Sequence, residues 1–323
     1  MTPTIKDVAK CAGVGVGTVS RVLNGESAVK SKTRSKVLDA MKQLNYSPNK
    51  MAAKLRRNET RNIALLVPIV YHPFFAEFAY YVEDEADKFG YSVILVSSQR
   101  KAEKENDIID RIKRREVDGA VFVTHFAHDG KKLADLPIVS IDRNFGEGIP
   151  YVTSDNFSAT ERAIRFLAEK GCKKIGFIGS KPLVESEVME RARAYESVMD
   201  ELGMEKRMVN EVIMHGDENT VVKKFIDAYP DADGVFASGY TMSQIFYEET
   251  IRRGKRIPED VQLISYDGAF GQWKDTKSIT CLEQPIEEMA RRVVSLLVKK
   301  IHGETVEKRT VLNTKFIFGS TTL

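Results

Sequence analysis

The chain has 323 residues, 42% of them hydrophobic and 29% charged; because a domain holds about 100 to 200 residues, this length excludes a single small module. The formal net charge of +3 is the sum of two unequal parts. Residues 1–61 contain 13 Lys or Arg and 4 Asp or Glu, a net charge of +9, whereas the other 36 Lys or Arg and 42 Asp or Glu give −6. A basic segment joined to a mildly acidic body is typical of a nucleic-acid-binding module attached to a body with another task.

Cysteine usage and hydropathy indicate a cytoplasmic protein. Cys11, Cys172 and Cys281 are far apart and odd in number, which predicts neither a disulfide framework nor a zinc site. Residues 1–7 lack the apolar stretch of a signal peptide, and the apolar run at residues 63–82 is interrupted by two prolines, a histidine and a glutamate. We therefore expect neither export nor a membrane segment.

The first 47 residues predict three short helices. Thr4 and Asp7 form a Thr-x-x-Asp cap for the first helix, and a glycine-bearing turn at residues 13–15 ends it. The second helix is expected over residues 16–23 and the third over about residues 32–44, and the third carries an apolar face of Val37, Leu38, Met41 and Leu44. Two short helices joined by such a turn and supported by a third predict a helix-turn-helix. Ser47 and Pro48 then begin a short fourth helix over residues 50–56.

Beyond residue 62, short apolar runs alternate with longer segments of helical period. Strands are expected at residues 63–67, 92–96, 119–123, 138–141, 174–178, 234–237 and 261–265. Helices are expected at residues 74–89, 102–115, 158–169, 186–202 and 242–253, with a last one at residues 286–301. Strands that are apolar along their whole length and alternate with helices predict an α/β fold with doubly wound parallel sheets, and about 260 residues favour two lobes.

Several runs of residues are more specific than this pattern. They are TIKDVAK (4–10), AGV (12–14), TVSRVLNG (18–25), YSPN (46–49) and AAKL (52–55), then in the body PFFAE (73–77), VDG (117–119), SDN (154–156), IPEDV (257–261), SYD (265–267) and EQP (283–285). Over essentially the whole chain they resemble the LacI/GalR family of bacterial transcription regulators. Within that family, residues 141–144, 149–157 and 266–268 look most like sucrose-operon repressors.

The resemblance implies a domain organisation. It predicts an all-α helix-turn-helix headpiece over residues 1–47, a hinge helix and linker over residues 48–61, and an effector-binding and dimerisation core over residues 62–323, similar to periplasmic sugar-binding proteins. In that core the N-lobe takes about residues 62–155 and 285–318, and the C-lobe about residues 156–284 and 319–323. Such regulators work as homodimers, because a pseudo-palindromic operator needs two headpieces related by a two-fold axis.

The resemblance also implies which residues contact operator DNA. The second helix enters the major groove, so Val16, Gly17, Thr18 and Arg21 meet bases, while Lys6, Ser20 and Asn24 hold phosphates. The full set is Thr4, Lys6, Val16, Gly17, Thr18, Ser20, Arg21, Asn24, Asn49, Lys50, Ala52, Ala53 and Leu55. Gly17 departs from the family, since it replaces a residue with a side chain and lowers helix propensity by about 1 kcal/mol.

In the hinge helix, small residues allow two partner helices to approach each other in the minor groove. Ala52 and Ala53 are these residues, and Leu55 matches the leucine that the family inserts between base pairs to kink the duplex. The alternative for Leu55 is ordinary packing.

Ligands of doubly wound sheets bind beyond the carboxyl ends of the strands. By resemblance, Asp142, Arg191 and Asp267 are expected to bind the hydroxyl groups of a sugar, with Arg143 beside them. The expected apolar wall comprises Phe74, Phe75 and Trp273, and Tyr240 stacks on the sugar where relatives carry a polar pair. Three alternatives stay open: each Asp caps a turn, the phenylalanines belong to the core, and the two arginines hold a sugar phosphate.

The predicted function is a transcriptional regulator, expected to be a repressor, of a carbohydrate-utilisation operon, controlled by a small sugar or phosphosugar of the sucrose type. Control by another sugar, of the maltose or ribose type, or by a partner protein is the alternative, and the sign of the effector's action is open. Enzyme activity and a cofactor are not expected, because the chain lacks nucleophile-elbow and phosphate-loop motifs, and a metal is not expected, because no third ligand cluster accompanies His125 and His128. His125 and His128 are interpreted as a solvated loop rather than metal ligands. A transport-type sugar-binding protein is disfavoured by the basic headpiece and the absent signal peptide.

Overall fold

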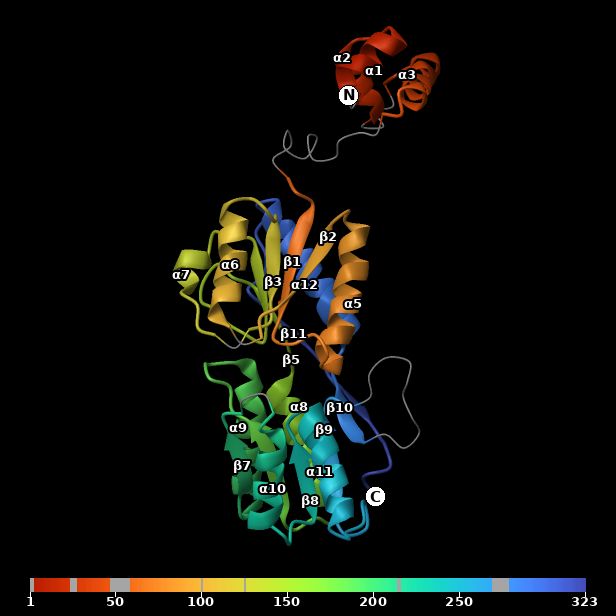
Figure 1. Ribbon diagram of the computed structural model, residues 1–323. Coiled ribbons are helices and arrows are strands. Elements are labelled where there is room, and N and C mark those ends of the chain that lie inside the picture. The colour runs from red at the N-terminus through yellow and green to blue at the C-terminus, as the bar shows by residue number, and fades with distance from the viewer. Residues whose placement is uncertain are drawn as a thin grey trace. The chain divides into compact units, whose positions relative to one another are not determined.

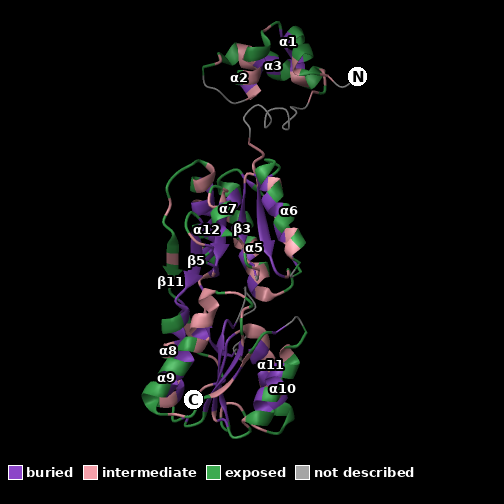
Figure 2. Cartoon of the chain, turned by 90° about the vertical axis from the view of Figure 1, so that its left-hand side faces the viewer, coloured by how far each residue is buried: buried purple, intermediate pink, exposed green. Residues whose placement is uncertain are grey.

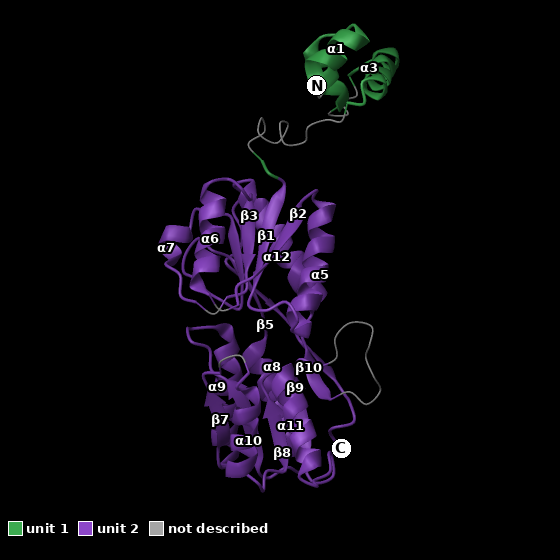
Figure 3. Cartoon of the chain, in the orientation of Figure 1, with its two compact units in different colours: residues 1–60 green, residues 61–323 purple. Residues whose placement is uncertain are grey.

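The computed structural model describes residues 3–23, 28–46, 59–99, 101–124, 126–213, 216–268 and 279–323. The chain divides into two compact units, Met1–Thr60 and Arg61–Leu323, and Figure 3 colours them separately. Within the described residues, no helix is both long and apolar enough to cross a membrane.

Within its described residues, the first unit packs helices α1 (Ile5–Ala12), α2 (Val16–Leu23) and α3 (Ser31–Gln43) together. Thr4 and Asp7 form the predicted capping box, and Gly13 ends α1 in the left-handed conformation, with φ +65°. The core of this unit consists of Val8, Ala9, Ala12, Val19, Val22, Val37 and Ala40. The prediction that Leu38 belongs to the buried face of α3 was wrong. Leu38 is 45% exposed, because the buried positions Val37 and Ala40 lie three residues apart and Leu38 points about 100° away from Val37.

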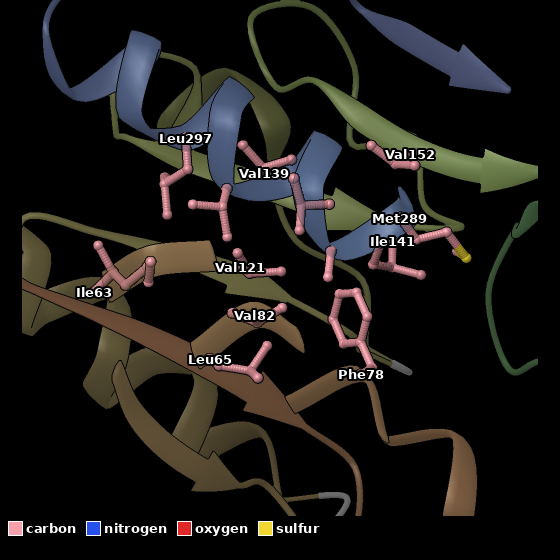
Figure 4. Packing of buried hydrophobic residues seen from close by; sticks show 14 of the residues in the cluster. Ile63, Leu65, Phe78, Val82, Val121, Val139, Ile141, Val152, Met289 and Leu297 are labelled. Atoms are coloured by element: carbon pink, nitrogen blue, oxygen red, sulfur yellow. The ribbon is translucent and has the colours of Figure 1, made fainter. Parts of the chain in front are cut away.

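The N-lobe of the second unit is a six-stranded parallel sheet in the order β11-β5-β4-β3-β1-β2. Its strands are β1 (Asn62–Val67), β2 (Ser92–Ser97), β3 (Gly119–Phe122), β4 (Ile138–Ile141), β5 (Tyr151–Ser154) and β11 (Arg309–Leu312). Helices α5 (Pro73–Lys88) and α12 (Ile286–Ile301) cover one face, where side chains such as Leu65, Phe78 and Leu297 interlock (Figures 1 and 4). Helices α6 (Ala102–Lys113) and α7 (Gly130–Leu133) cover the other face.

The C-lobe repeats this plan, with strand order β12-β10-β9-β8-β6-β7. The strands are β6 (Ile175–Ser180), β7 (Arg207–Glu211), β8 (Gly234–Ala237), β9 (Gln262–Tyr266), β10 (Thr280–Glu283) and the antiparallel β12 (Lys315–Ile317). Helices α8 (Asn156–Glu169) and α9 (Glu190–Leu202), the latter preceded by the 3-10 turn η1 (Glu187–Met189), cover one face. Helices α10 (Glu218–Ala228) and α11 (Tyr240–Arg252) cover the other. In both lobes Figure 2 shows buried inner strands between helices whose outer faces are exposed, whereas β11 at one sheet edge is partly exposed.

In the described part of the second unit, the chain passes between the lobes three times. Two passages join β5 to α8 and β10 to α12, close to the expected residues 156 and 284. The third lies between Leu312 and Lys315, earlier than the expected residue 318, because β12 already pairs with β10 of the C-lobe. Asp155 ties the first passage to the third, since its carboxylate accepts the backbone N–H of Thr314 at 2.8 Å and pairs with Arg162 at 3.0 Å.

Candidate effector-binding site and DNA-binding surface

In the first unit, α2 presents a mostly polar face outward. Its inner side buries Val19 and Val22, while Val16 is 39% exposed and Gly17 and Arg21 are exposed. Thr18 and Ser20 are half-buried at the edge of this face, and Lys6 is exposed on α1. Thr4 is committed to the cap, because its hydroxyl donates to the carboxylate of Asp7 at 2.7 Å. The other expected DNA contacts, Asn24, Asn49, Lys50, Ala52, Ala53 and Leu55, lie outside the described residues.

In the second unit, a cavity of about 270 Å³ is lined by side chains from both lobes. It brings together all the described residues that the sequence suggested for the effector: Phe74, Phe75, Asp142 and Arg143 from the N-lobe, and Arg191, Tyr240 and Asp267 from the C-lobe. Trp273 lies outside the described residues. Each lobe therefore supplies at least one carboxylate, one guanidinium group and one aromatic ring.

The two carboxylates sit on backbone that folds into the left-handed region. Asp142 directly follows β4 with φ +56°, and Asp267 directly follows β9 with φ +63°. Burial raises the pKa of Asp142, although the Thr153 hydroxyl, donating at 2.6 Å, opposes the shift. Burial likewise raises the pKa of Asp267 to about 6, against the opposing effects of Arg191 and of the Gln284 amide, which donates at 3.0 Å. Both groups are hydrogen-bond acceptors held in a site of low polarity.

Arg191 is fixed by three contacts on the C-lobe side. Its Nε donates to the side-chain oxygen of Asn156 at 2.7 Å, and its Nη1 donates to the carbonyl of Ser238 at 2.8 Å. Its guanidinium carbon lies 3.4 Å from the ring centre of Tyr266. A guanidinium held so rigidly can donate to a ligand with little loss of side-chain entropy.

Arg143 is held less completely. It is buried, its Nη2 donates to the carbonyl of Phe126 at 3.2 Å, and its guanidinium carbon lies 5.3 Å from the ring centre of Phe145. Burial lowers its pKa, and among the described residues its Nε has no hydrogen-bond partner. An unsatisfied buried donor beside a cavity is a position that a ligand oxygen can fill.

Sequence reasoning missed several lining residues. Lys181 and Ser238 directly follow β6 and β8, so the rule that identified Asp142 and Asp267 could also have found them, whereas His72 directly precedes α5. Burial lowers the pKa of His72, and its Nδ1 has no partner among the described residues.

The interpretation of His128 as part of a solvated loop was wrong. Its side chain is 8% exposed, and its Nε2 lies 2.5 Å from the buried carboxylate of Glu105 on α6. His125 lies outside the described residues, and no cluster of metal ligands occurs among the residues that are described.

Glu187 connects the lobes beside the cavity. Its carboxylate accepts from the Tyr151 hydroxyl at 2.8 Å and pairs with Arg309 at 3.0 Å, both in the N-lobe. Its backbone N–H and the Ser186 hydroxyl both donate to the carbonyl of Asp142 at 3.0 Å. This part of the C-lobe is therefore docked on the residue that carries one of the two cavity carboxylates.

Comparison with known proteins agrees with this architecture. Residues 4–49 match the family described as bacterial regulatory proteins, lacI family, and residues 164–322 match a periplasmic binding protein-like domain. The chain is 34% identical to a ribose operon repressor of Halalkalibacterium halodurans, over 99% of this chain and 97% of the relative. It is 31% identical to a sucrose operon repressor of Streptococcus mutans, over 99% of both chains. A solved complex of the transcriptional regulator CelR with cellobiose superposes with a TM-score of 0.72, at 29% identity and over 99% of both chains.

These findings confirm the predicted fold class and family. Because the relatives include both ribose and sucrose operon repressors, the likeness to the sucrose type stays a prediction. The relatives are regulators of transcription rather than enzymes. With its helical N-terminal unit, its two-lobed core and relatives that match it from end to end, the chain belongs to the lacI family of bacterial regulatory proteins.

Proposed function

We propose that this lacI-family regulator is a homodimeric repressor of a carbohydrate-utilisation operon that binds a small sugar or phosphosugar between its lobes. The observation that carries the proposal is the convergence of Asp142, Asp267 and Arg191 on one cavity with aromatic walls. A sugar offers hydroxyl groups to acceptors and donors and an apolar C–H face to a ring, so this set of side chains suits it. The chain would act in the cytoplasm, where operator DNA lies.

The volume of the cavity restricts the ligand. At about 270 Å³ it lies near the lower limit of about 300 Å³ for pockets that hold drug-sized ligands. A monosaccharide or a disaccharide is thus a better candidate than a longer oligosaccharide. The names of the relatives add ribose, sucrose and cellobiose as sugars to test first.

We propose that the dimer interface lies at the β2 edge of the N-lobe, where a second copy of the chain binds. Among the described strands β2 pairs only with β1, and its Leu95 is 47% exposed. Tyr80, on the neighbouring helix α5, is 66% exposed. An exposed apolar edge strand is a liability unless something covers it, and a palindromic operator requires two copies related by a two-fold axis.

The proposed coupling between effector and DNA runs through closure of the lobes. A ligand that bridges Asp142 and Asp267 favours the arrangement in which the lobes are close, and Glu187 already joins them there. Because linkage is reciprocal, a sugar that changes operator affinity must have its own affinity changed by operator to the same extent, typically by about 1 to 3 kcal/mol.

A thermal-shift panel tests the proposal. Full-length protein is heated with sucrose, ribose, cellobiose, maltose, fructose and their available phosphates, and each stabilising sugar is tested again with operator DNA. We expect at least one sugar to stabilise the protein and to alter operator affinity in a gel-shift titration. A variant that lacks residues 1–61 should keep the sugar response and lose DNA binding. A panel in which no sugar stabilises the full-length protein would contradict the proposal.

A further inference from the structure

Helix α6 carries a glutamate on its buried, otherwise apolar face. Glu105 is spaced at three, four and seven residues from Ile108, Ile109 and Ile112, and its exposure is 0%. A buried carboxylate is strongly destabilising unless hydrogen bonds and positive charge compensate it. The partners of Glu105 therefore show what this residue holds in place.

The partners of Glu105 all lie in the loop that follows β3. The hydroxyl of Thr124 lies 2.5 Å from the carboxylate of Glu105 and accepts the backbone N–H of Phe126 at 3.0 Å. The imidazole of His128 lies 2.5 Å from the same carboxylate. One buried side chain on α6 thus contacts both Thr124 and His128.

Two routes lead from this turn to Arg143 in the cavity. The first route runs through the backbone of Phe126. Its N–H donates to the Thr124 hydroxyl, and its carbonyl accepts a hydrogen bond from Arg143. In the second, the ring of His128 packs edge-on to the ring of Phe145 at 5.6 Å, and the guanidinium of Arg143 lies over the ring of Phe145. Glu105 also attracts the charge of Arg143 directly, which opposes the effect of burial on the pKa of that arginine.

The main chain next to Arg143 is closely packed. Gly130, which begins α7, lies so close to the carbonyl oxygen of Phe145 that an added Cβ would be 1.5 Å from it. The backbone of Arg143 is itself held, because its carbonyl accepts from the buried hydroxyl of Ser140 at 2.6 Å. These contacts hold the main chain at Arg143, and the side chain of Arg143 is held in addition by Phe126 and Phe145, which contact the partners of Glu105.

We propose that Glu105 is a positioning residue of the effector site: through Thr124 and His128 it sets the guanidinium of Arg143 for contact with an oxygen of the bound ligand. Glu105 itself does not line the cavity, although Thr124 and Arg143 do. The role in ligand binding rests on the proposed function, whereas the effect of Glu105 on Arg143 can be measured without any ligand.

The first measurement records the arginine Nε–H signals of the ¹⁵N-labelled, full-length protein, assigned with Arg143→Lys and Arg191→Lys variants. In Glu105→Gln the Arg143 signal should shift or broaden, while the Arg191 signal, whose Nε–H is bound to Asn156, should not change. The matched control is Glu249→Gln. Glu249, on α11 of the C-lobe, is likewise a buried glutamate; it pairs with Arg253 and does not line the cavity. Its loss should leave both signals unchanged even if the melting temperature falls.

The second measurement is the dissociation constant for ribose or sucrose, whichever stabilises the wild type, by titration calorimetry. Glu105→Gln should weaken binding by about tenfold and Glu249→Gln should not, as expected for a lost hydrogen bond to a charged group. If Glu105→Gln does not fold, His128→Gln, which removes one route only, should still move the Arg143 signal. An unchanged Arg143 signal in a folded variant overturns the proposal, whereas a shifted signal without sugar binding by the wild type contradicts only the proposed effector.

Discussion

Asp142 and Asp267 occupy equivalent positions in the two lobes. Asp142 follows β4, the third strand from the β11 edge, and Asp267 follows β9, the third strand from the β12 edge. Both have positive φ, and each donates its backbone N–H at 3.0 Å to the carbonyl of a residue in the adjacent strand, Val152 for Asp142 and Leu282 for Asp267. Such backbone is strained by about 1 to 3 kcal/mol and tends to occur at binding sites. The repeated plan of the lobes thus brings one carboxylate from each to the same cavity, where the charge of Arg191 opposes the burial effect on both.

Removing the charge of Asp267 should weaken ligand binding without lowering the stability of the protein. Asp267→Asn should weaken the affinity for the effector sugar by about tenfold to a hundredfold, because a hydrogen bond to a charged acceptor contributes about 1.5 to 3 kcal/mol. The melting temperature of the unliganded protein should stay the same or rise, because a carboxylate that burial destabilises has been neutralised. Titration calorimetry and thermal unfolding measure the two effects. Asp200→Asn, on the exposed surface of α9, is the control and should change neither.

Effector affinity and the contribution of Asp267 to the free energy of unfolding should change with pH in opposite directions. Because the pKa of Asp267 is raised from 3.8 to about 6, this group is protonated below about pH 6 and ionised above it. Effector affinity should therefore fall as the pH drops below about 6, while the contribution of this group to the free energy of unfolding should fall as the pH rises from about 4 to 6. Calorimetric titrations and urea unfolding across this range test both trends. Their persistence in Asp267→Asn would show that another group is responsible.

Glu187 should control how easily the lobes stay together. Glu187→Gln keeps the size of the side chain and removes the charge that pairs with Arg309, so the arrangement with docked lobes should be less populated and effector affinity should fall by about two- to tenfold. Small-angle scattering of the unliganded core should show a larger radius of gyration. Glu201→Gln, which loses an ion pair with Arg165 inside the C-lobe, is the matched control. Equal losses of affinity in the two variants would contradict a role in lobe closure.

The exposed edge of the N-lobe sheet gives a test of the dimer. Leu95→Glu places a charge on β2 and should convert the protein to a monomer, with a severe loss of operator affinity, because one headpiece then binds one half-site. Val311→Glu is the control, since Val311 is 42% exposed on β11, at the opposite edge of the same sheet. Sedimentation velocity distinguishes the outcomes. A dimer that survives Leu95→Glu and is lost in Val311→Glu would place the interface at the other edge.

Burial on both faces makes a strand easier to predict from the sequence, but it does not decide the matter alone, because the sequence predicts the half-exposed edge strand β2 and not the buried strand β5. β3, β4 and β8 are buried at every position and appear as continuous apolar runs. β7, β11 and β12 lie at sheet edges and carry charged residues such as Arg207 and Arg309, so their composition does not differ from that of a loop. The same limit applies to the site. The strand-end rule predicts Asp142 and Asp267, but the contact of His128 with Glu105 joins residues 23 positions apart on different elements, and no local pattern indicates it.

Gly17 stands where the family carries a residue with a side chain, and this difference has a measurable consequence for the headpiece. Gly17 lies within α2, and an added Cβ would meet nothing within 4 Å, so Gly17→Ala should stabilise the first unit by about 1 kcal/mol through helix propensity alone. Gly13 also has open space around it, but its φ of +65° is one that a side chain disfavours, so Gly13→Ala should destabilise the unit by about 1 kcal/mol. Thermal unfolding of the two variants can be monitored by circular dichroism. The two glycines differ in backbone conformation, whereas both have open space for an added Cβ. If Gly17→Ala is stabilising yet weakens operator binding, the backbone at this position must approach the DNA too closely for a side chain. Operator binding that is unchanged or tighter would instead show that the family's base contact at this position is simply missing from this protein.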